Sequence, residues 1–325
     1  MWNRAGIAKA LALGVLLSFM LFGGSAEAAY PEKPLWWVVP YPAGGSADVV
    51  SRIITKRLSE RLKQPIIVDN KPGATGAVGA GFVAHAAPDG YTILYQGFDL
   101  AINPLVRTLP FDPLKHLTPV TQVSNQWTIM VAPKDAPYNT FAEFVDYARK
   151  NPDKMNFGTT GAASAGHLTG ELFKKESKLN MVDIPFKGGG PGVIAAVGGQ
   201  VSIYYATPGS GMPYIQSGQL KPLVVSAPTR MATLPNTPTF AEVGYPNIVS
   251  SEWTGILVPQ GTPADIVQFL NREIREVLAE PAISEQITKM GIEIVTNSPQ
   301  EFDKFLGNET QRWGKVVREL NLKYD

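Results

Sequence analysis

The apolar and polar positions follow a recurring order along this chain: a short apolar run, a loop of small residues, and apolar residues at helical spacing. Residues 35–39 form the first apolar run, and residues 47–62 place apolar side chains on one face of a predicted helix. Residues 66–68 and 91–95 are further strand candidates, with a helix between them that ends near Ala87. This alternation predicts a parallel sheet covered by helices.

The same order begins again in the middle of the chain. Residues 127–131 and 155–157 are predicted strands, and between them a capping box at Thr140 begins a helix. A second loop of small residues, 158–167, leads into a helix that ends near Lys178. The strands that complete this unit are predicted at residues 181–184, 201–205 and 220–226.

The last part of the chain has the pattern of a segment that returns to the first unit. Residues 253–258 form a predicted strand, and Pro263 occupies the first position of a predicted helix. A capping box at Ser298 begins a terminal helix that ends near Leu320. A chain of 325 residues is long for one core and natural for two lobes.

The first residues have the pattern of a signal peptide. Arg4 and Lys9 supply positive charge, and the apolar residues 11–22 form a stretch too short to span a bilayer comfortably. Residues 26–28, Ala-Glu-Ala, fit the small-x-small rule, so we expect cleavage after Ala28. No later apolar stretch is long enough for a transmembrane helix. The sequence therefore predicts an exported protein of a bacterial periplasm.

The composition of the chain excludes several classes of function. The chain is 44% hydrophobic and 18% charged, as globular proteins are, and its net charge of +1 gives no reason to expect a nucleic acid as a partner. The sequence has no cysteine, which excludes disulfides, a thiol nucleophile and cysteine-based zinc sites. His85, His116 and His167 lack the spacing of metal ligands. We expect neither a metal nor a cofactor.

The usual catalytic motifs are absent from the sequence as well. Ser164 lies near His167, but the residue two places before Ser164 is alanine, so the Gly-x-Ser-x-Gly motif of serine hydrolases is absent. The glycine-rich residues 73–81 lack the Lys-Ser/Thr ending of a P-loop. We therefore expect a protein that is not an enzyme.

Residues 40–48 predict a sharp corner between a strand and a helix. Gly44 and Gly45 allow the backbone to turn and to approach a ligand closely, and Ser46 or Asp48 can cap the helix. The first amides of a helix lack internal partners, so such a corner suits an anion such as a carboxylate. On this stretch alone, an ordinary connection between a strand and a helix is the simpler interpretation.

Residues 158–167 repeat this corner in the second unit. His167 lies in it, where a structural hydrogen bond is at least as good an explanation as a functional role. Phe98 follows a glycine at the carboxyl end of a predicted strand, which is where ligands bind in open α/β sheets. Phe98 is therefore the better candidate for a ligand contact among the aromatic residues, most of which we expect in the core.

Several short motifs occur together in the order and spacing of one known family. They are residues 30–34, 39–48, 69–74, 87–92, 102–104, 166–168, 185–188, 234–239 and 259–263. On these motifs the sequence resembles the periplasmic solute-binding proteins of tripartite tricarboxylate transporters, also called the Bug family. The resemblance extends over essentially the whole mature chain.

The resemblance implies an α/β fold of the two-lobed Venus-flytrap kind, similar to type II periplasmic binding proteins, with a ligand cleft between the lobes. After a signal peptide at residues 1–28, the first lobe would comprise residues 29–124 and 253–325. The second lobe would comprise residues 125–252.

The resemblance also implies that the two small-residue loops hold a carboxylate of the ligand, partly through ordered water. Asp48 would cap the helix or hold water rather than touch the ligand, because it is an acid beside an anion site. The implied residues are Tyr41, Ala43, Gly44, Ser46 and Asp48 in one lobe and Thr160, Ala162, Ala163, Ser164 and His167 in the other.

Two stretches, residues 96–99 and 205–208, depart from the family pattern where the far end of the ligand should lie. Phe98 in the first stretch and Tyr205 in the second favour an aromatic ligand such as a terephthalate-like acid over a dicarboxylate or tricarboxylate. Thr207 in the second stretch is a further candidate contact. Asp99, if it points inward, would disfavour a second carboxylate or recognise an amine or a hydroxyl. The sequence leaves these alternatives open.

The resemblance implies a monomeric receptor that captures a small organic carboxylate and delivers it to two integral-membrane permease subunits. Two other functions remain open at this point. The same fold permits a receptor that reports its ligand to a signalling partner. A periplasmic enzyme acting on a carboxylated substrate would need Asp48, Asp99 or His167 as an acid or a base.

Overall fold

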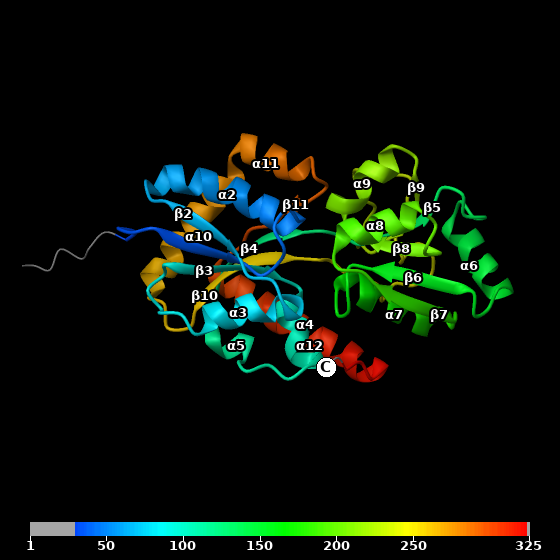
Figure 1. Cartoon of the computed structure of the whole chain (residues 1–325), viewed down its shortest axis with the longest axis horizontal. Helices are drawn as coiled ribbons and strands as arrows, with labels where there is room; N and C mark the ends of the chain where they lie inside the picture. Colours follow the sequence, from blue (N-terminus) through cyan, green and yellow to red (C-terminus); the bar gives the residue numbers. More distant parts are fainter. Residues whose placement is uncertain (1–29, 324–325) are drawn as a thin grey trace, which may run out of the picture.

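The chain forms two α/β lobes, each built around its own sheet (Figure 1). The structure is a computed structural model and describes residues 30–323, so the predicted signal peptide lies outside the described residues. The first sheet has the strand order β11-β4-β10-β3-β1-β2. Its strands are β1 (Leu35–Val39), β2 (Ile66–Asn70), β3 (Thr92–Gly97), β4 (Leu117–Asn125), β10 (Thr254–Pro259) and β11 (Glu293–Ile294).

The second sheet has the strand order β7-β6-β8-β5-β9, and all its strands come from the middle of the chain. They are β5 (Ile129–Pro133), β6 (Met155–Thr159), β7 (Met181–Pro185), β8 (Ile203–Ala206) and β9 (Leu220–Val225). The helices of this lobe are α6 (Phe141–Lys150), α7 (Ala165–Ser177), α8 (Gly189–Val197) and α9 (Pro208–Gln216).

Both sheets are mixed, which corrects the prediction of a parallel sheet. Strand β1 pairs in parallel with β2 and β3, as the alternating pattern predicts. Strand β10 pairs antiparallel with both β3 and β4, because it enters the first lobe from the second. In the second sheet, β5 is likewise antiparallel to β8 and β9. The antiparallel pairs therefore arise where the chain crosses between lobes.

Helices of the first lobe cover both faces of its sheet. They are α2 (Ser46–Leu62), the short 3-10 helix η1 (Ala74–Gly76), α3 (Ala77–Ala84), α4 (Asp99–Val106), α5 (Pro113–His116), α10 (Ala264–Ala279), α11 (Pro281–Thr288) and α12 (Pro299–Leu320). The predicted capping box at the start of α12 is present, since Ser298 and Glu301 bond to each other's backbone N–H. Within residues 30–323, no helix combines the length and apolar character needed to cross a membrane.

Two chain crossings join the lobes, and they are hydrogen-bonded to each other. The backbone N–H of Gln126 donates to the carbonyl of Glu252 at 3.1 Å, and the N–H of Glu252 donates back to Gln126 at 2.9 Å. Trp127 and Ser251 continue this antiparallel contact by one bridge. The crossings therefore act as one short two-stranded link rather than as two separate linkers.

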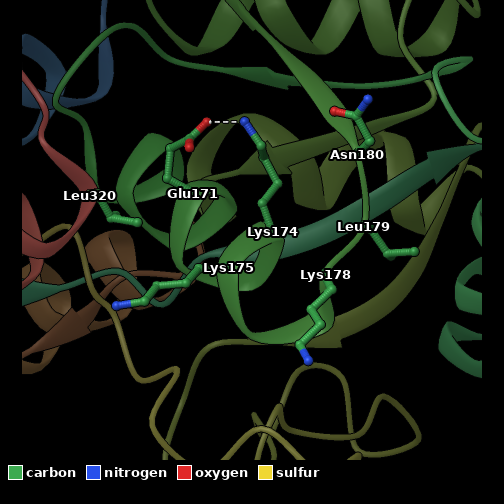
Figure 2. Close-up of a pocket in the computed structure, with 7 residues that line it drawn as sticks. All are labelled: Glu171, Lys174, Lys175, Lys178, Leu179, Asn180 and Leu320. Carbon is green, nitrogen blue, oxygen red and sulfur yellow. Dashed lines mark hydrogen bonds and ion pairs between the residues drawn. The ribbon is translucent and has the colours of Figure 1, made fainter.

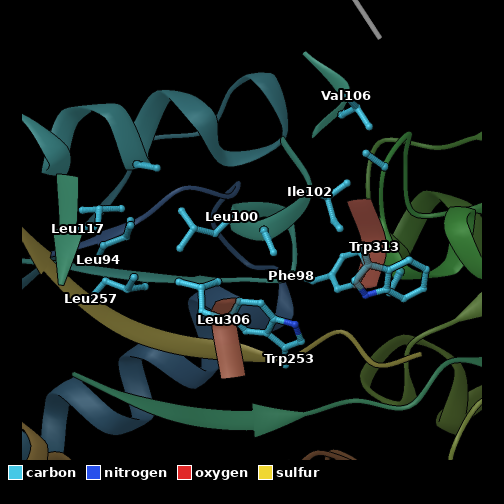
Figure 3. Packing of buried hydrophobic residues seen from close by; sticks show 14 of the residues in the cluster. Leu94, Phe98, Leu100, Ile102, Val106, Leu117, Trp253, Leu257, Leu306 and Trp313 are labelled. Atoms are coloured by element: carbon cyan, nitrogen blue, oxygen red, sulfur yellow. The ribbon is translucent and has the colours of Figure 1, made fainter. Parts of the chain in front are cut away.

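One hydrophobic cluster extends from the first lobe into the second. The ring of Phe98, at the start of α4, meets the ring of Trp313 on α12 edge to face, with centroids 5.3 Å apart (Figure 3). Ala165 and Leu168 of α7 are buried in the same cluster. The end of α12 also reaches α7 through an exposed ion pair between Lys175 and Glu319. The lobes thus share apolar contact beside the crossings.

Close packing at the crossing of β3 and β10 gives a stability prediction. A Cβ on Gly97 would lie 1.8 Å from the Trp253 carbonyl oxygen, a backbone atom that cannot move aside alone. Gly97→Ala should therefore lower the melting temperature by about 5 °C or more, as overpacked core substitutions do.

Gly307→Ala is the matched control, because it lies within α12 with no atom within 4 Å of the added Cβ. Alanine forms helices better than glycine, so this variant should melt at the same temperature or higher. Thermal unfolding of both proteins checks the prediction. Equal melting temperatures for the two variants would contradict the packing described here.

Candidate functional site

The first predicted corner lies at the edge of the first lobe that faces the second. Helix α2 begins at Ser46, with Gly45 as its N-cap and Gly44 in the left-handed region at φ +81°. Asp48 accepts a hydrogen bond from the Gly44 N–H at 2.9 Å and pairs with Arg52 at 3.0 Å. Asp48 therefore holds the loop in shape. No side chain caps α2 by a hydrogen bond, so the expected cap by Ser46 or Asp48 is wrong.

The two lobes meet beside the crossings at Gln126 and Glu252, and this place is called the junction below. Ser46 faces the second lobe across the junction. A Cβ on Gly209 would lie 3.4 Å from the Ser46 hydroxyl oxygen and 3.8 Å from Oε1 of Gln126. The Ser46 hydroxyl and Gln126 Oε1 are both buried without a hydrogen-bond partner among the described residues. Gly209 is the second residue of α9, so the N-termini of α2 and α9 meet here. The dipoles of both helices favour a negative charge there, although α9 begins with a proline and its Ser210 and Gly211 N–H groups already donate to the Thr207 carbonyl.

The second predicted corner is built differently, because protein side chains already occupy its helix N-terminus. Ser164 is the N-cap of α7 and accepts a hydrogen bond from the His167 N–H at 3.2 Å. The Ala165 N–H donates to Oε2 of Glu252, also at 3.2 Å. Two amides that the sequence analysis offered to a ligand are thus bound by Ser164 and Glu252. Glu252 was absent from the predicted site.

His167 is a structural residue of the second lobe. It is buried, and its Nε2 lies 3.5 Å from Oδ2 of Asp183. Burial lowers the pKa of His167 to about 4, and burial raises the pKa of Asp183 to about 6. The imidazole is therefore neutral near pH 7, which gives no support to His167 as a catalytic acid.

Asp99 points inward, which answers a question that the sequence left open. It is the first residue of α4, is 3% exposed, and accepts a hydrogen bond from the Tyr41 hydroxyl at 2.7 Å. Burial raises its pKa to about 6. Burial, together with the negative charge of Asp99, raises the pKa of Glu252 to about 8. Asp99 and Glu252 are therefore two buried acids at the junction whose charges act on each other, and they are called the acid pair below.

Gln96 lies beside this acid pair and was also missed by the sequence analysis. Its side chain has no exposed surface, and neither its Nε2 nor its Oε1 has a hydrogen-bond partner among the described residues. A Cβ on Gly76 would lie 2.5 Å from Gln96 Nε2 and 3.5 Å from Asp99 Oδ2, so both side chains meet over the Gly76 backbone. A polar residue at the carboxyl end of a buried strand was the signal that could have revealed it.

The two aromatic residues expected to touch a ligand lie in hydrophobic cores. Phe98 has no exposed surface and packs against Trp313, because α4 begins directly after it and turns its ring under α12. Tyr205 is 1% exposed, and its ring meets Phe157 edge to face. Only the Tyr205 hydroxyl, which is buried without a partner, remains a candidate for a polar contact. The expected contact of the Phe98 ring is therefore corrected.

The remaining predicted residues are spread over the two loops. Ala43 and Gly44 are exposed, Thr160 and Ala162 are half-buried, and Ala163 is buried in the cluster beneath α12. Thr207 is the N-cap of α9, and its hydroxyl forms a 3.0 Å hydrogen bond with the Ser210 hydroxyl. The structure thus brings Tyr41, Ser46, Asp99 and Thr207 to the junction or to elements that begin there.

A surface pocket lies elsewhere, at the outer end of α7 (Figure 2). Two of its three lysines are paired, Lys174 with Glu171 at 2.8 Å and Lys175 with Glu319 at 2.6 Å. Paired surface lysines of this kind form ordinary solvated contacts. The junction, with its unpartnered buried groups, is the better candidate site. The pocket is lined by Glu171, Lys174, Lys175, Lys178, Leu179, Asn180 and Leu320.

This fold of two α/β lobes is that of periplasmic solute-binding proteins. The chain belongs to the tripartite tricarboxylate transporter family receptors, whose family model matches residues 50–322. Protein BugT of Bordetella pertussis (strain Tohama I) is 33% identical to it over 297 residues, which cover 90% of this chain and 91% of BugT.

Solved structures agree with this assignment. One described as "R. palustris Rpa4515 with adipate" has a TM-score of 0.84 at 29% identity, covering 90% of this chain and 99% of that one. MatC from Rhodopseudomonas palustris, with bound malate, has a TM-score of 0.80 at 31% identity, covering 89% and 100%. The resemblance predicted from the sequence motifs is confirmed, and the chain is a solute-binding receptor rather than an enzyme.

The acid pair predicts an unusual dependence of stability on pH. The ordinary pKa values of Asp99 and Glu252 are 3.8 and 4.5, and in the folded protein both are raised. A raised acid stabilises the fold fully below its ordinary pKa, and this contribution is lost as the pH rises through the raised value. From pH 5 to pH 8.5 the protein should therefore lose stability through this pair.

The double variant Asp99→Asn, Glu252→Gln removes both titrations and keeps the side-chain shapes. The fall in melting temperature between pH 5 and pH 8.5 should be smaller in this variant than in the wild type, by about 5 °C. Asp183 and His167 titrate in both proteins, so the difference isolates the pair. Superimposable pH profiles would show that the two carboxyl groups are not buried together.

Proposed function

We propose that this receptor captures a small organic carboxylate at the junction and presents it to a permease of two integral-membrane subunits. The observation that supports it most is the unpartnered Ser46 hydroxyl where the N-termini of α2 and α9 meet. A carboxylate there would accept hydrogen bonds from this hydroxyl and from free helix amides. No covalent step is needed.

Capture at this place also explains how the receptor would signal that it is loaded. Ser46 belongs to the first lobe and Gly209 to the second, so a carboxylate between them touches both. Such a ligand binds the closed arrangement more tightly than an open one and shifts the population toward it. A permease that recognises the closed surface would then select loaded receptors.

The ligand class that we propose differs from the aromatic acid that the sequence favoured. The preference for an aromatic, terephthalate-like acid rested on Phe98 and Tyr205, whose rings are packed in cores. An aliphatic carboxylate is better supported, in line with the adipate and malate of the two R. palustris proteins. We further propose that the receptor acts as a periplasmic monomer after cleavage behind Ala28.

Crowding Ser46 tests this proposal. Gly209→Leu should weaken binding of a carboxylate by at least tenfold, which corresponds to about 1.4 kcal/mol, because a Cβ at Gly209 already touches the Ser46 hydroxyl and a larger side chain would force the two helix N-termini apart. The measurement is a thermal-shift screen of the mature protein with adipate, malate, succinate and citrate, followed by calorimetry of every compound that raises the melting temperature.

Gly190→Leu is the matched control. Gly190 is also the second residue of a helix in the second lobe, α8, and a Cβ added there meets no atom within 4 Å. This variant should bind as the wild type does. Equal affinity in Gly209→Leu and wild type would remove the junction from the binding site, and a wild type that binds no carboxylate would refute the function itself.

A further inference from the structure

Asp99 and Glu252 form no ion pair with a cation among the described residues, although the charge of Arg107 acts on Asp99 from a longer distance. Their hydrogen bonds come from neutral groups, the Tyr41 hydroxyl and the Ala165 N–H. Buried carboxylates are expected to be paired or to bind a proton. Near pH 7 a proton satisfies Glu252, whose pKa burial raises to about 8, and a ligand cation would take the place of that proton and pair with Asp99.

Gln96 points to a ligand independently of any charge. Its amide is fully buried beside Asp99, yet none of its hydrogen-bonding atoms has a protein partner. Leaving a buried amide unsatisfied costs about 1–3 kcal/mol, so this side chain calls for a partner such as a water, an ion or a ligand. Its Oε1 adds a third acceptor to those of Asp99 and Glu252.

This set of acceptors fits an ammonium group best. An ammonium has three N–H donors and a positive charge, so it can bond to several acceptors and balance the buried acids. A hydroxyl would offer one donor and no charge. A second carboxylate would be repelled by the pair at short range in a medium of low dielectric constant.

The acid pair lies next to the proposed carboxylate site. Glu252 is hydrogen-bonded through its backbone to Gln126, whose Oε1 borders Gly209 and Ser46. Tyr41 lies in the corner that leads to Ser46 and donates its hydroxyl hydrogen to Asp99. The helix N-termini at Ser46 and Gly209, which favour an anion, thus lie beside the acids Asp99 and Glu252 at the crossings.

We propose that the ligand is a small zwitterion, an aliphatic carboxylate whose ammonium group binds between Asp99, Glu252 and Gln96. This inference rests on the proposed function, since it places the carboxylate of the same ligand at Ser46. It assigns Asp99 and Glu252 as the residues that determine specificity among carboxylates.

Matched pairs of compounds test the proposal by calorimetry on the mature protein. Each pair keeps the carbon chain and changes one group: aspartate against malate, 4-aminobutyrate against succinate, and 6-aminohexanoate against adipate. In at least one pair the amino compound should bind tenfold or more tightly than its partner. Partners that bind as tightly as the amino compounds, or more tightly, in every pair overturn the proposal.

Variants then connect the preference to the acid pair. Asp99→Asn and Glu252→Gln keep the shape and remove the charge, so each should reduce the amino preference at least tenfold while retaining the weaker binding of the plain acid. Glu273→Gln is the control, because Glu273 is a largely buried acid that pairs with Arg61 far from the crossings. It should leave the preference unchanged.

The outcomes separate this inference from the proposed function. If diacids bind and amino compounds do not, the receptor is supported and the zwitterion is wrong. If the amino preference persists unchanged in both Asp99→Asn and Glu252→Gln, the acid pair does not recognise the ammonium. If no compound of any pair binds, the carboxylate function and this inference both fail. The wild-type comparison decides the proposal even if a variant does not fold.

Discussion

The paired backbone hydrogen bonds of Gln126 and Glu252 are the constraint on which the site depends. They hold the two chain crossings side by side, so the lobes are joined by a link with a defined direction. The side chains of the same two residues face the junction, where Gln126 borders α9 and Glu252 binds the N-terminus of α7. The link between the lobes and the candidate site are therefore built from the same residues.

The two sides of this link favour opposite charges, one because of helix N-termini and the other because of acidic side chains. Helix N-termini at Ser46 and Gly209 make one side favourable for an anion. The acids Asp99 and Glu252 make the other side rich in acceptors, and one helix N-terminus, that of α7, is already occupied by Glu252. Under the two proposals, a receptor with this arrangement would select its ligand by two groups rather than by a single carboxylate.

Much of the fold could be predicted from the sequence, and the limits of the prediction have physical causes. Alternating strands and helices were recognisable because their apolar periods differ. Helix α9 was missed because Gly209, Gly211 and Pro213 are poor helix formers, although Pro208 suits its first position. The antiparallel strands were missed because direction depends on how the chain crosses between lobes, which no local pattern records.

The candidate site was predicted in part. Tyr41 and Ser46 were recognisable from the family motifs, and Asp99 from its place after a strand, in a stretch that departs from those motifs. Gln96, Gln126 and Glu252 were missed, because a single polar residue beside a strand has no distinctive pattern until the crossings bring it together with others. Phe98 was misjudged for the converse reason, since only the packing of α12 shows which way its ring turns.

A crystal structure of the protein with its most tightly bound compound would test the central claim most directly. The account predicts one molecule between the lobes, with its carboxylate within hydrogen-bond distance of Ser46 and the N-terminus of α9. The same molecule should place its amino group against Asp99 and Glu252. A ligand that touches one lobe only, or that lies in the lysine-lined pocket of α7, would contradict the account.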